Sequence, residues 1–80
     1  MRLPRDLSGS DLAQTQGNLG YSIARQTGSH LRLTTQQHGE HHLTIPQHDP
    51  LRVGTLSAIL ADVTDHFKIT REQLLNRLFE

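Results

Sequence analysis

One histidine in this chain stands where an imidazole could act on a phosphodiester. His30 follows Gly28–Ser29, a dipeptide typical of a turn, and Arg32 comes two residues later. Residues two apart in a β-strand project from the same face, so His30 and Arg32 would lie side by side. An imidazole can remove the proton from a 2′-hydroxyl, and a guanidinium can neutralise the charge that grows on the phosphate. The pair predicts metal-free RNA cleavage, although the same spacing also fits an ordinary surface histidine.

The other five histidines raise the question of a metal site. His38 and His41, with His42 or His48, could be imagined as zinc ligands. Zinc sites usually include cysteine or a carboxylate, and the chain has no cysteine. Strand neighbours point to opposite faces, so His41 and His42 would not face one ion. We therefore expect no metal, and we interpret His66, near the negative end of a helix dipole, as structural.

Two other arrangements are weaker candidates for chemistry. Ser29 beside His30 is disfavoured as a nucleophilic dyad, because adjacent strand residues face opposite ways and no orienting carboxylate is evident. Gly54–Thr55 opens a predicted helix, and the N-terminus of a helix can hold a phosphate. A single glycine is a far weaker signal than a phosphate-binding loop, so simple helix initiation is the better interpretation.

The composition indicates one small domain, residues 1–80, in a reducing compartment. There is no cysteine, no apolar leader and no run of membrane-spanning length, so we expect a cytoplasmic protein. Lys plus Arg and Asp plus Glu both number 8, which argues against a strong basic field for nucleic acid. Five of the six histidines lie in residues 21–53, so this segment would be the positive part of the molecule near and below neutral pH.

A first helix is predicted over residues 9–19. Ser8 is its expected N-cap, with Asp11 reaching back to complete a capping box. This is the weakest predicted element, because Gln16 stands where an apolar residue would pack better. Gly17 costs a further ~1 kcal/mol relative to alanine.

Two later helices are predicted from capping and apolar spacing. The first carries a continuous amphipathic stripe, formed by Leu56, Ile59, Leu60, Val63 and Phe67. A second capping box at Thr70–Gln73 opens the last helix, whose inward residues are Leu74, Leu75 and Leu78.

Three short runs that alternate apolar and polar residues lie between the first and second helices. They cover residues 21–26, 30–35 and 41–46, with turns at Thr27–Gly28 and His38–Gly39. The expected buried side consists of Tyr21, Ile23, Leu31, Leu33, Leu43 and Ile45. The expected open side consists of Gln26, His30, Arg32, Thr34, His42 and Thr44.

These elements predict an α+β fold in the order α-β-β-β-α-α. A three-stranded antiparallel sheet with one apolar face needs helices packed on that face. The order resembles the plan of the double-stranded-RNA-binding domain, although a fold alone does not fix a function.

Several runs of the sequence match one protein family in order and spacing. They are Leu3–Gly9, Leu19–Tyr21, Arg25–Leu33 with its Gly-Ser-His tripeptide, Ile45–His48, Leu51–Leu56 and Thr70–Glu72. In these runs the chain resembles the HicA toxin family nearly from end to end.

The resemblance implies a toxin that cleaves messenger RNA and is held inactive by a HicB antitoxin covering its active face. It implies that the histidine of the Gly-Ser-His tripeptide, here His30, is the catalytic residue, with no cofactor. We expect the RNA to be contacted by Ser29, Arg32, Arg25, His42 and His48.

Two alternatives compete with a ribonuclease. The first is a non-catalytic RNA-binding or protein-interaction module on the same fold. The balanced charge favours it, as does the presence of Lys68 as the only lysine where family members are usually richer in lysine. The second is a histidine-rich metal-binding domain. The placement of His30 with Arg32, together with the resemblance, favours the ribonuclease.

Overall fold

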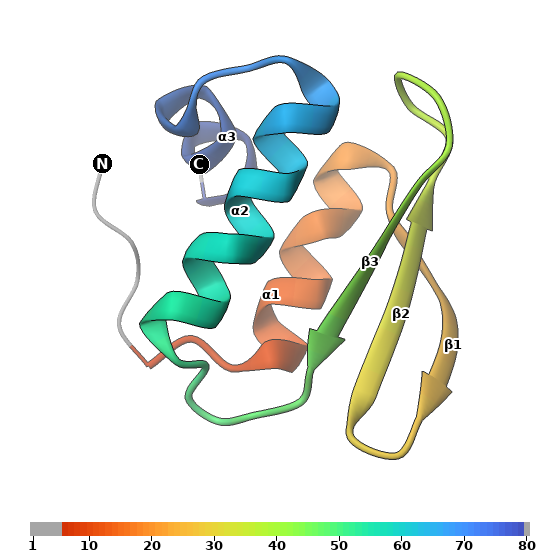
Figure 1. Ribbon diagram of the computed structural model, residues 1–80, viewed down its shortest axis with the longest axis vertical. Helices are drawn as coiled ribbons and strands as arrows, with labels where there is room; N and C mark the ends of the chain where they lie inside the picture. The colour runs from red at the N-terminus through yellow and green to blue at the C-terminus, as the bar shows by residue number, and fades with distance from the viewer. Residues whose placement is uncertain (1–5, 80) are drawn as a thin grey trace.

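The computed structural model describes residues 6–79, which form three helices packed on one antiparallel sheet (Figure 1). The elements are α1 (Gly9–Gln16), a 3₁₀ turn η1 (Gly17–Leu19), β1 (Ser22–Thr27), β2 (His30–Thr35), β3 (His41–Pro46), α2 (Val53–Phe67) and α3 (Arg71–Phe79). This is the predicted α+β fold, with the α-β-β-β-α arrangement of a double-stranded-RNA-binding domain. Residues 3–5, part of the sequence resemblance, lie outside the described residues.

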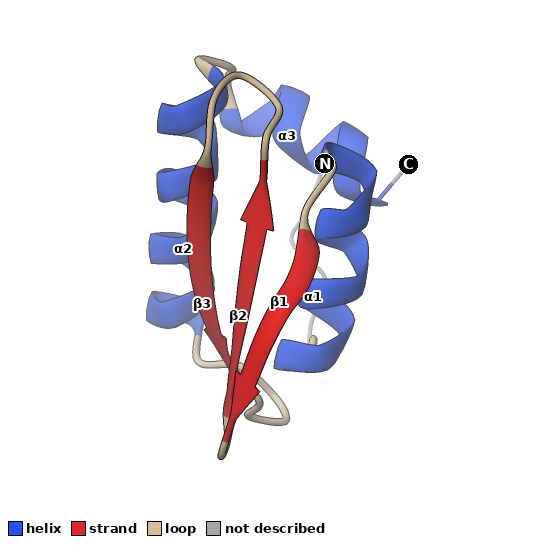
Figure 2. Ribbon diagram, turned by 90° about the vertical axis from the view of Figure 1, so that its right-hand side faces the viewer, coloured by secondary structure: helices blue, strands red, loops and turns tan. Residues whose placement is uncertain are grey.

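The sheet is a meander with β2 in its centre, and the helices cover one face of it (Figure 2). β2 and β3 pair in regular antiparallel register, with Leu31 opposite Ile45 and Leu33 opposite Leu43. All four side chains are buried against the helices. Both strands begin and end where the alternation of apolar and polar residues predicted, and the opposite face of the sheet is left open.

The helices contribute the predicted apolar residues to one core between helices and sheet. The stripe of α2 and the inward leucines of α3 are all buried, as expected from their spacing. The capping box that opens α3 is also confirmed. The Thr70 amide donates to Gln73 Oε1 at 2.9 Å, and the Gln73 amide donates to Thr70 Oγ1 at 3.1 Å.

The first helix is shorter than predicted. Its capping box is confirmed, because the Asp11 amide donates to Ser8 Oγ at 3.0 Å and Asp11 Oδ2 lies 3.5 Å from the Ser8 amide. The α-helix ends at Gln16 rather than continuing to residue 19. The tighter turn η1 follows and is capped by Gly20, whose φ of 81° lies in the left-handed region. This turn delivers Tyr21 to the core, where its amide bonds the Gln16 carbonyl at 3.3 Å.

Gln16 occupies the buried face of α1, where the spacing favoured an apolar residue. Its side chain is completely buried, and neither Nε2 nor Oε1 has a hydrogen-bond partner among residues 6–79. A buried polar group without a partner costs ~1–3 kcal/mol of stability. Gln16 is therefore a weak point of the core.

The first strand departs from simple alternation. A bulge shifts its register between Ile23 and Arg25, so that Arg25 pairs with Arg32 and Gln26 pairs with Leu31. An extra residue reverses the face of every side chain that follows it. The prediction that Gln26 lies on the open face is therefore wrong. Ile23 also fails as a core residue, because it is 57% exposed on the edge strand.

Candidate active site on the open face of the sheet

His30 begins the central strand and is exposed on the open face, as predicted. It pairs with Thr27 of β1 on one side and with Pro46 of β3 on the other. The hairpin turn before it depends on Gly28, whose φ of 56° is disfavoured for residues with a Cβ. The imidazole therefore stands on regular strand backbone next to a tight turn, where it is accessible to a large substrate.

The end of β3 anchors the turn beside His30. The Gln47 amide donates to the Ser29 carbonyl at 2.6 Å. The Gln47 side chain accepts from Gln26 Nε2 at 3.2 Å and donates to Ser10 Oγ of α1 at 3.4 Å. These contacts join β1, the end of β3 and α1, and they therefore fix the backbone that carries His30. Ser29 itself is exposed at the turn.

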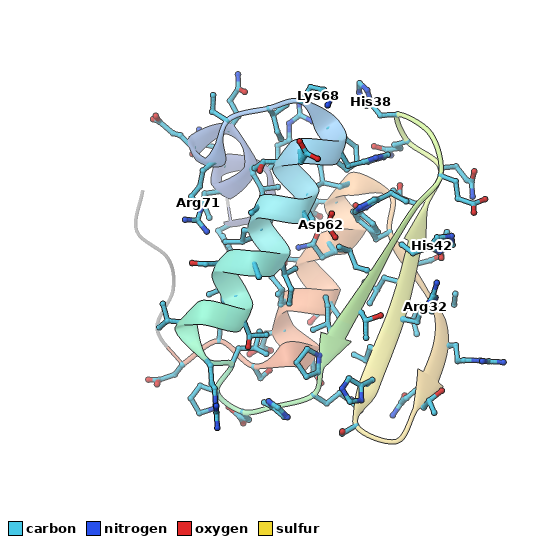
Figure 3. All side chains as sticks on the ribbon, in the orientation of Figure 1. Arg32, His38, His42, Asp62, Lys68 and Arg71 are labelled. Carbon is cyan, nitrogen blue, oxygen red and sulfur yellow. The ribbon has the colours of Figure 1, made fainter. Side chains whose placement is uncertain are left out.

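Arg32 lies two residues after His30 on the same face, and both side chains are exposed. A strand rises about 3.3 Å per residue, so their Cα atoms are about 7 Å apart. Arg32 pairs with Arg25 of β1 and with Thr44 of β3. Figure 3 shows Arg32 on the sheet, on the side of the molecule away from α2 and α3. The structure thus brings His30, Arg32 and Arg25 onto one surface.

His42 lies on the same open face but further along the sheet (Figure 3). Its Nδ1 is 2.8 Å from Thr34 Oγ1, and its Nε2 is 2.8 Å from Glu40 Oε2. The hydrogen bond from His42, followed by one from Gln36, lowers the pKa of the exposed Glu40 carboxyl. His42 is four residues from the partner of His30 on β3, about 13 Å along the strand. It is therefore too distant to act on the same phosphorus atom.

His41 points to the helix side, opposite to His42. Its Nδ1 lies 2.6 Å from the hydroxyl of Tyr21, and its Nε2 lies 3.2 Å from Asp62 Oδ1 of α2. Its ring stacks on His66 at a centroid distance of 4.3 Å. His66 Nε2 donates to the Gln37 carbonyl at 2.9 Å, in the structural role expected for it. Within residues 6–79, no three His, Asp or Glu side chains gather as metal ligands.

His48 lies in the loop between β3 and α2, two residues beyond the partner of His30. Its side chain is exposed, and its carbonyl accepts the amide of Gly9 at 2.9 Å. It is thus at the same end of the sheet as His30 but beyond the last paired residue of β3. Of the residues expected to contact RNA, His42 and His48 are the two that the structure sets apart from His30 and Arg32.

The sequence did not predict why Arg25 and Arg32 lie opposite each other. Arg25 would lie on the helix side if alternation continued from Tyr21 and Ile23, and the bulge places it opposite Arg32 instead. The signal was the charge of Arg25 itself, because unbroken alternation would place this arginine on the buried face. Gln26 takes the inward position instead, where it pairs with buried Leu31 and bonds Gln47.

A comparison with protein-family models matches residues 9–64 to the HicA toxin of bacterial toxin–antitoxin systems. The chain belongs to the HicA toxin family. The matched segment runs from the start of α1 into α2 and includes the whole sheet with His30. As a HicA protein, the chain is the toxin of a toxin–antitoxin pair. No curated protein and no solved structure matches it significantly.

The described part of this HicA protein has no helix that is both long and apolar enough to cross a membrane.

Proposed function

We propose that this HicA protein is an endoribonuclease that cleaves messenger RNA in the cytoplasm without a metal ion, with His30 as general acid or base. The observation that carries the proposal is the exposed imidazole of His30 on the open face. Arg32 lies two residues further along β2 on the same face. The two groups supply what RNA cleavage requires, a proton carrier and a positive charge near the phosphate.

The reaction would begin with the 2′-hydroxyl of the nucleotide next to the scissile phosphate. Unprotonated His30 accepts the 2′-hydroxyl proton as the oxygen attacks phosphorus and the bond to the 5′-oxygen breaks. The leaving 5′-oxygen takes up a proton from water to become a hydroxyl, His30 returns its proton to the solvent, and the other fragment ends in a 2′,3′-cyclic phosphate. Arg32 neutralises the charge on the phosphate oxygens during this step. Ser29, in the turn before His30, and His48, in the loop after β3, would contact the flanking nucleotides.

The partner of the toxin would be a HicB-type antitoxin that covers the open face. Occlusion of this face keeps messenger RNA away from His30, and it requires no change of shape in the toxin. The sheet residues are polar there, so such a partner would bind through charge pairing and hydrogen bonds.

The test is RNA cleavage by the purified protein and by a His30→Ala variant. Loss of a general acid or base lowers a rate by about 10²- to 10⁴-fold, and growth inhibition should disappear with it. The fold should be retained, because His30 is exposed. His38→Asn is the matched control, since His38 is an exposed histidine in the turn at the other end of the sheet (Figure 3). Cleavage by His30→Ala at the parent rate would refute the assignment.

A second measurement separates this mechanism from metal-assisted hydrolysis. Cleavage should persist in excess EDTA and should leave 5′-hydroxyl ends together with 2′,3′-cyclic phosphate or 3′-phosphate ends. If chelation abolished cleavage and zinc restored it, the histidines would have to be reinterpreted as metal ligands.

A further inference from the structure

The bulge in β1 places two arginines directly opposite each other. Arg25 and Arg32 are paired across β1 and β2, and both are exposed on the open face. Like charges directly opposite in a sheet destabilise it. A bulge that turns an arginine toward another arginine therefore acts against stability, which suggests that the pair has an anionic ligand.

No carboxylate among the described residues neutralises this pair. Among residues 6–79 the ion pairs are those of His41 with Asp62 and of His42 with Glu40, and neither involves an arginine. The three strands contain no Asp or Glu at all. The guanidinium groups of Arg25 and Arg32 are thus available to an anion from outside.

The surroundings of the pair favour a phosphodiester. The strands contain no Phe, Tyr or Trp, so the open face lacks the aromatic platform on which single-stranded bases usually stack. Recognition must then rest on the backbone of the nucleic acid. Arg32 is about 7 Å from His30 along β2, which is close to the separation of neighbouring phosphates in a single strand. The next pair on the open face is Thr34 with His42, and His42 bonds the Glu40 carboxylate. The negative charge of Glu40 would repel a further phosphate.

We infer that Arg25 and Arg32 act as one unit that binds the phosphodiester next to the one positioned at His30. The inference rests on the proposed function in that the bound polymer is the RNA substrate. Two planar guanidinium groups can grip one phosphate from two sides, each through paired N–H donors. The unit would fix the register of the RNA, so that the neighbouring phosphate lies at the imidazole. Arg25 and Arg32 are then positioning residues, and the positive charge of Arg32 also acts from about 7 Å away on the phosphate at His30.

The test measures binding without cleavage. A labelled single-stranded RNA oligonucleotide is titrated against His30→Ala protein, alone and combined with Arg25→Gln, Arg32→Gln or both, over a range of salt concentrations. Each single change should weaken binding roughly tenfold, as expected for loss of a charge-assisted contact. The salt dependence gives the sharper result. The remaining arginine still neutralises the shared phosphate, so single changes leave the slope of log K against log salt nearly constant. The double change lowers its magnitude by about 0.7.

Arg71→Gln is the matched control, because Arg71 is exposed on α3, on the other side of the molecule (Figure 3). It should change neither affinity nor slope. Two arginines on separate phosphates would each lower the slope magnitude by about 0.7, and that result overturns the shared unit. Unchanged RNA binding in all Arg25 and Arg32 variants also overturns the inference. This holds even if the same variants bind the antitoxin more weakly. A lack of measurable RNA binding by the His30→Ala protein overturns it as well. This experiment measures binding and not cleavage. A failure of the proposed His30 mechanism would therefore leave the binding result unchanged, and the two failures can be told apart.

Discussion

Tyr21 is the only tyrosine in the chain, so its ionisation can be followed without interference. Burial, and secondly the negative charge of Asp62, raise the pKa of its phenol well above the usual 10.0. The hydroxyl is therefore protonated at working pH and can donate to His41 Nδ1 at 2.6 Å. His41 in turn contacts Asp62 through Nε2, so one chain of polar groups links the residue before β1 to β3 and α2.

An alkaline titration should reveal this environment. The folded-state pKa of Tyr21 is raised, so the stability that the neutral phenol contributes is present below pH 10.0 and is lost as the pH rises further. Phenolate absorbance of the native protein should appear at a clearly higher pH than in concentrated urea, where the unfolded chain serves as its own reference. Equal midpoints in the two conditions would show that Tyr21 is accessible and unpaired.

Replacement of Gln16 should stabilise the protein. Gln16→Met keeps an unbranched side chain of similar length and removes the two buried polar atoms that lack partners. The expected gain is ~1–3 kcal/mol in the free energy of unfolding, measured by urea denaturation. Gln14→Met is the control, since Gln14 is exposed on the same helix and should change stability little. A loss of stability in Gln16→Met would mean that the amide makes a favourable interaction in solution.

At the level of single residues, the sequence was sufficient where a side chain has one clear environment. His30, Arg32 and His42 lie on the open face because each alternates with a leucine or isoleucine that must be buried. The positions of Arg25 and Gln26 could not be derived in this way. They depend on an extra residue in β1, and alternation alone does not locate it, although a charged residue at an inward position of an edge strand indicates that alternation breaks there.

The helices and strands differ in how well their sequences define them. β2 and β3 were predicted to the residue, because both have buried leucines or isoleucines at alternate positions. The first helix was predicted too long, because its C-terminal turn is set by the path to Tyr21 rather than by local preference. Capping boxes were reliable at both Ser8 and Thr70, since each depends on side chains only three residues away.

The start of α1 is packed so closely against the end of β3 that only glycine fits. A Cβ at Gly9 would lie 1.8 Å from the Pro46 carbonyl oxygen, and the Gly9 amide bonds the His48 carbonyl. Pro46 is also the partner of His30 in the sheet. The packing of α1 therefore determines the position of the strand end that lies beside the catalytic candidate.

Gly9→Ala should destabilise the fold by at least ~1–3 kcal/mol, the usual cost of inserting a methyl group into a fully packed site. The obstructing atoms are backbone, so they have little freedom to move aside. Gly17→Ala is the control, because a Cβ there meets nothing within 4 Å and the backbone is right-handed helical. It should be neutral or stabilising by up to ~1 kcal/mol. Thermal unfolding of the two variants checks the prediction, and equal stabilities would argue against the close contact at Gly9.

For the whole molecule, the balanced charge conceals a separation of charge. The strands carry Arg25 and Arg32 and no carboxylate, while the acids of the described chain lie in helices, turns and loops. One of them, Glu40, is bound to His42 at the edge of the open face. A net charge of zero therefore argued against nucleic acid only as long as the fold was unknown. With the fold in place, the open face has a positive centre at the two arginines.

This separation predicts how the antitoxin should bind. The open face is the one side of the sheet that the described helices leave uncovered, and its arginines need an acidic complement (Figure 2). Arg32→Glu should therefore weaken binding of the cognate antitoxin, as measured by calorimetry. Binding of the unmodified toxin should also weaken as salt rises, because exposed charges are screened. The loss from Arg32→Glu should shrink at high salt for the same reason.

Arg71→Glu introduces the same change of charge on α3, at the side of the molecule away from the sheet (Figure 3). If the antitoxin covers the open face, this variant should bind it with nearly the affinity of the unmodified toxin. Long-range attraction alone would weaken both variants to a similar degree, because it depends on net charge rather than on position. A strong effect confined to Arg71→Glu would place the antitoxin on the helices and leave His30 accessible in the complex. Inhibition would then require a change in the toxin itself, since an uncovered imidazole beside Arg32 could still reach RNA.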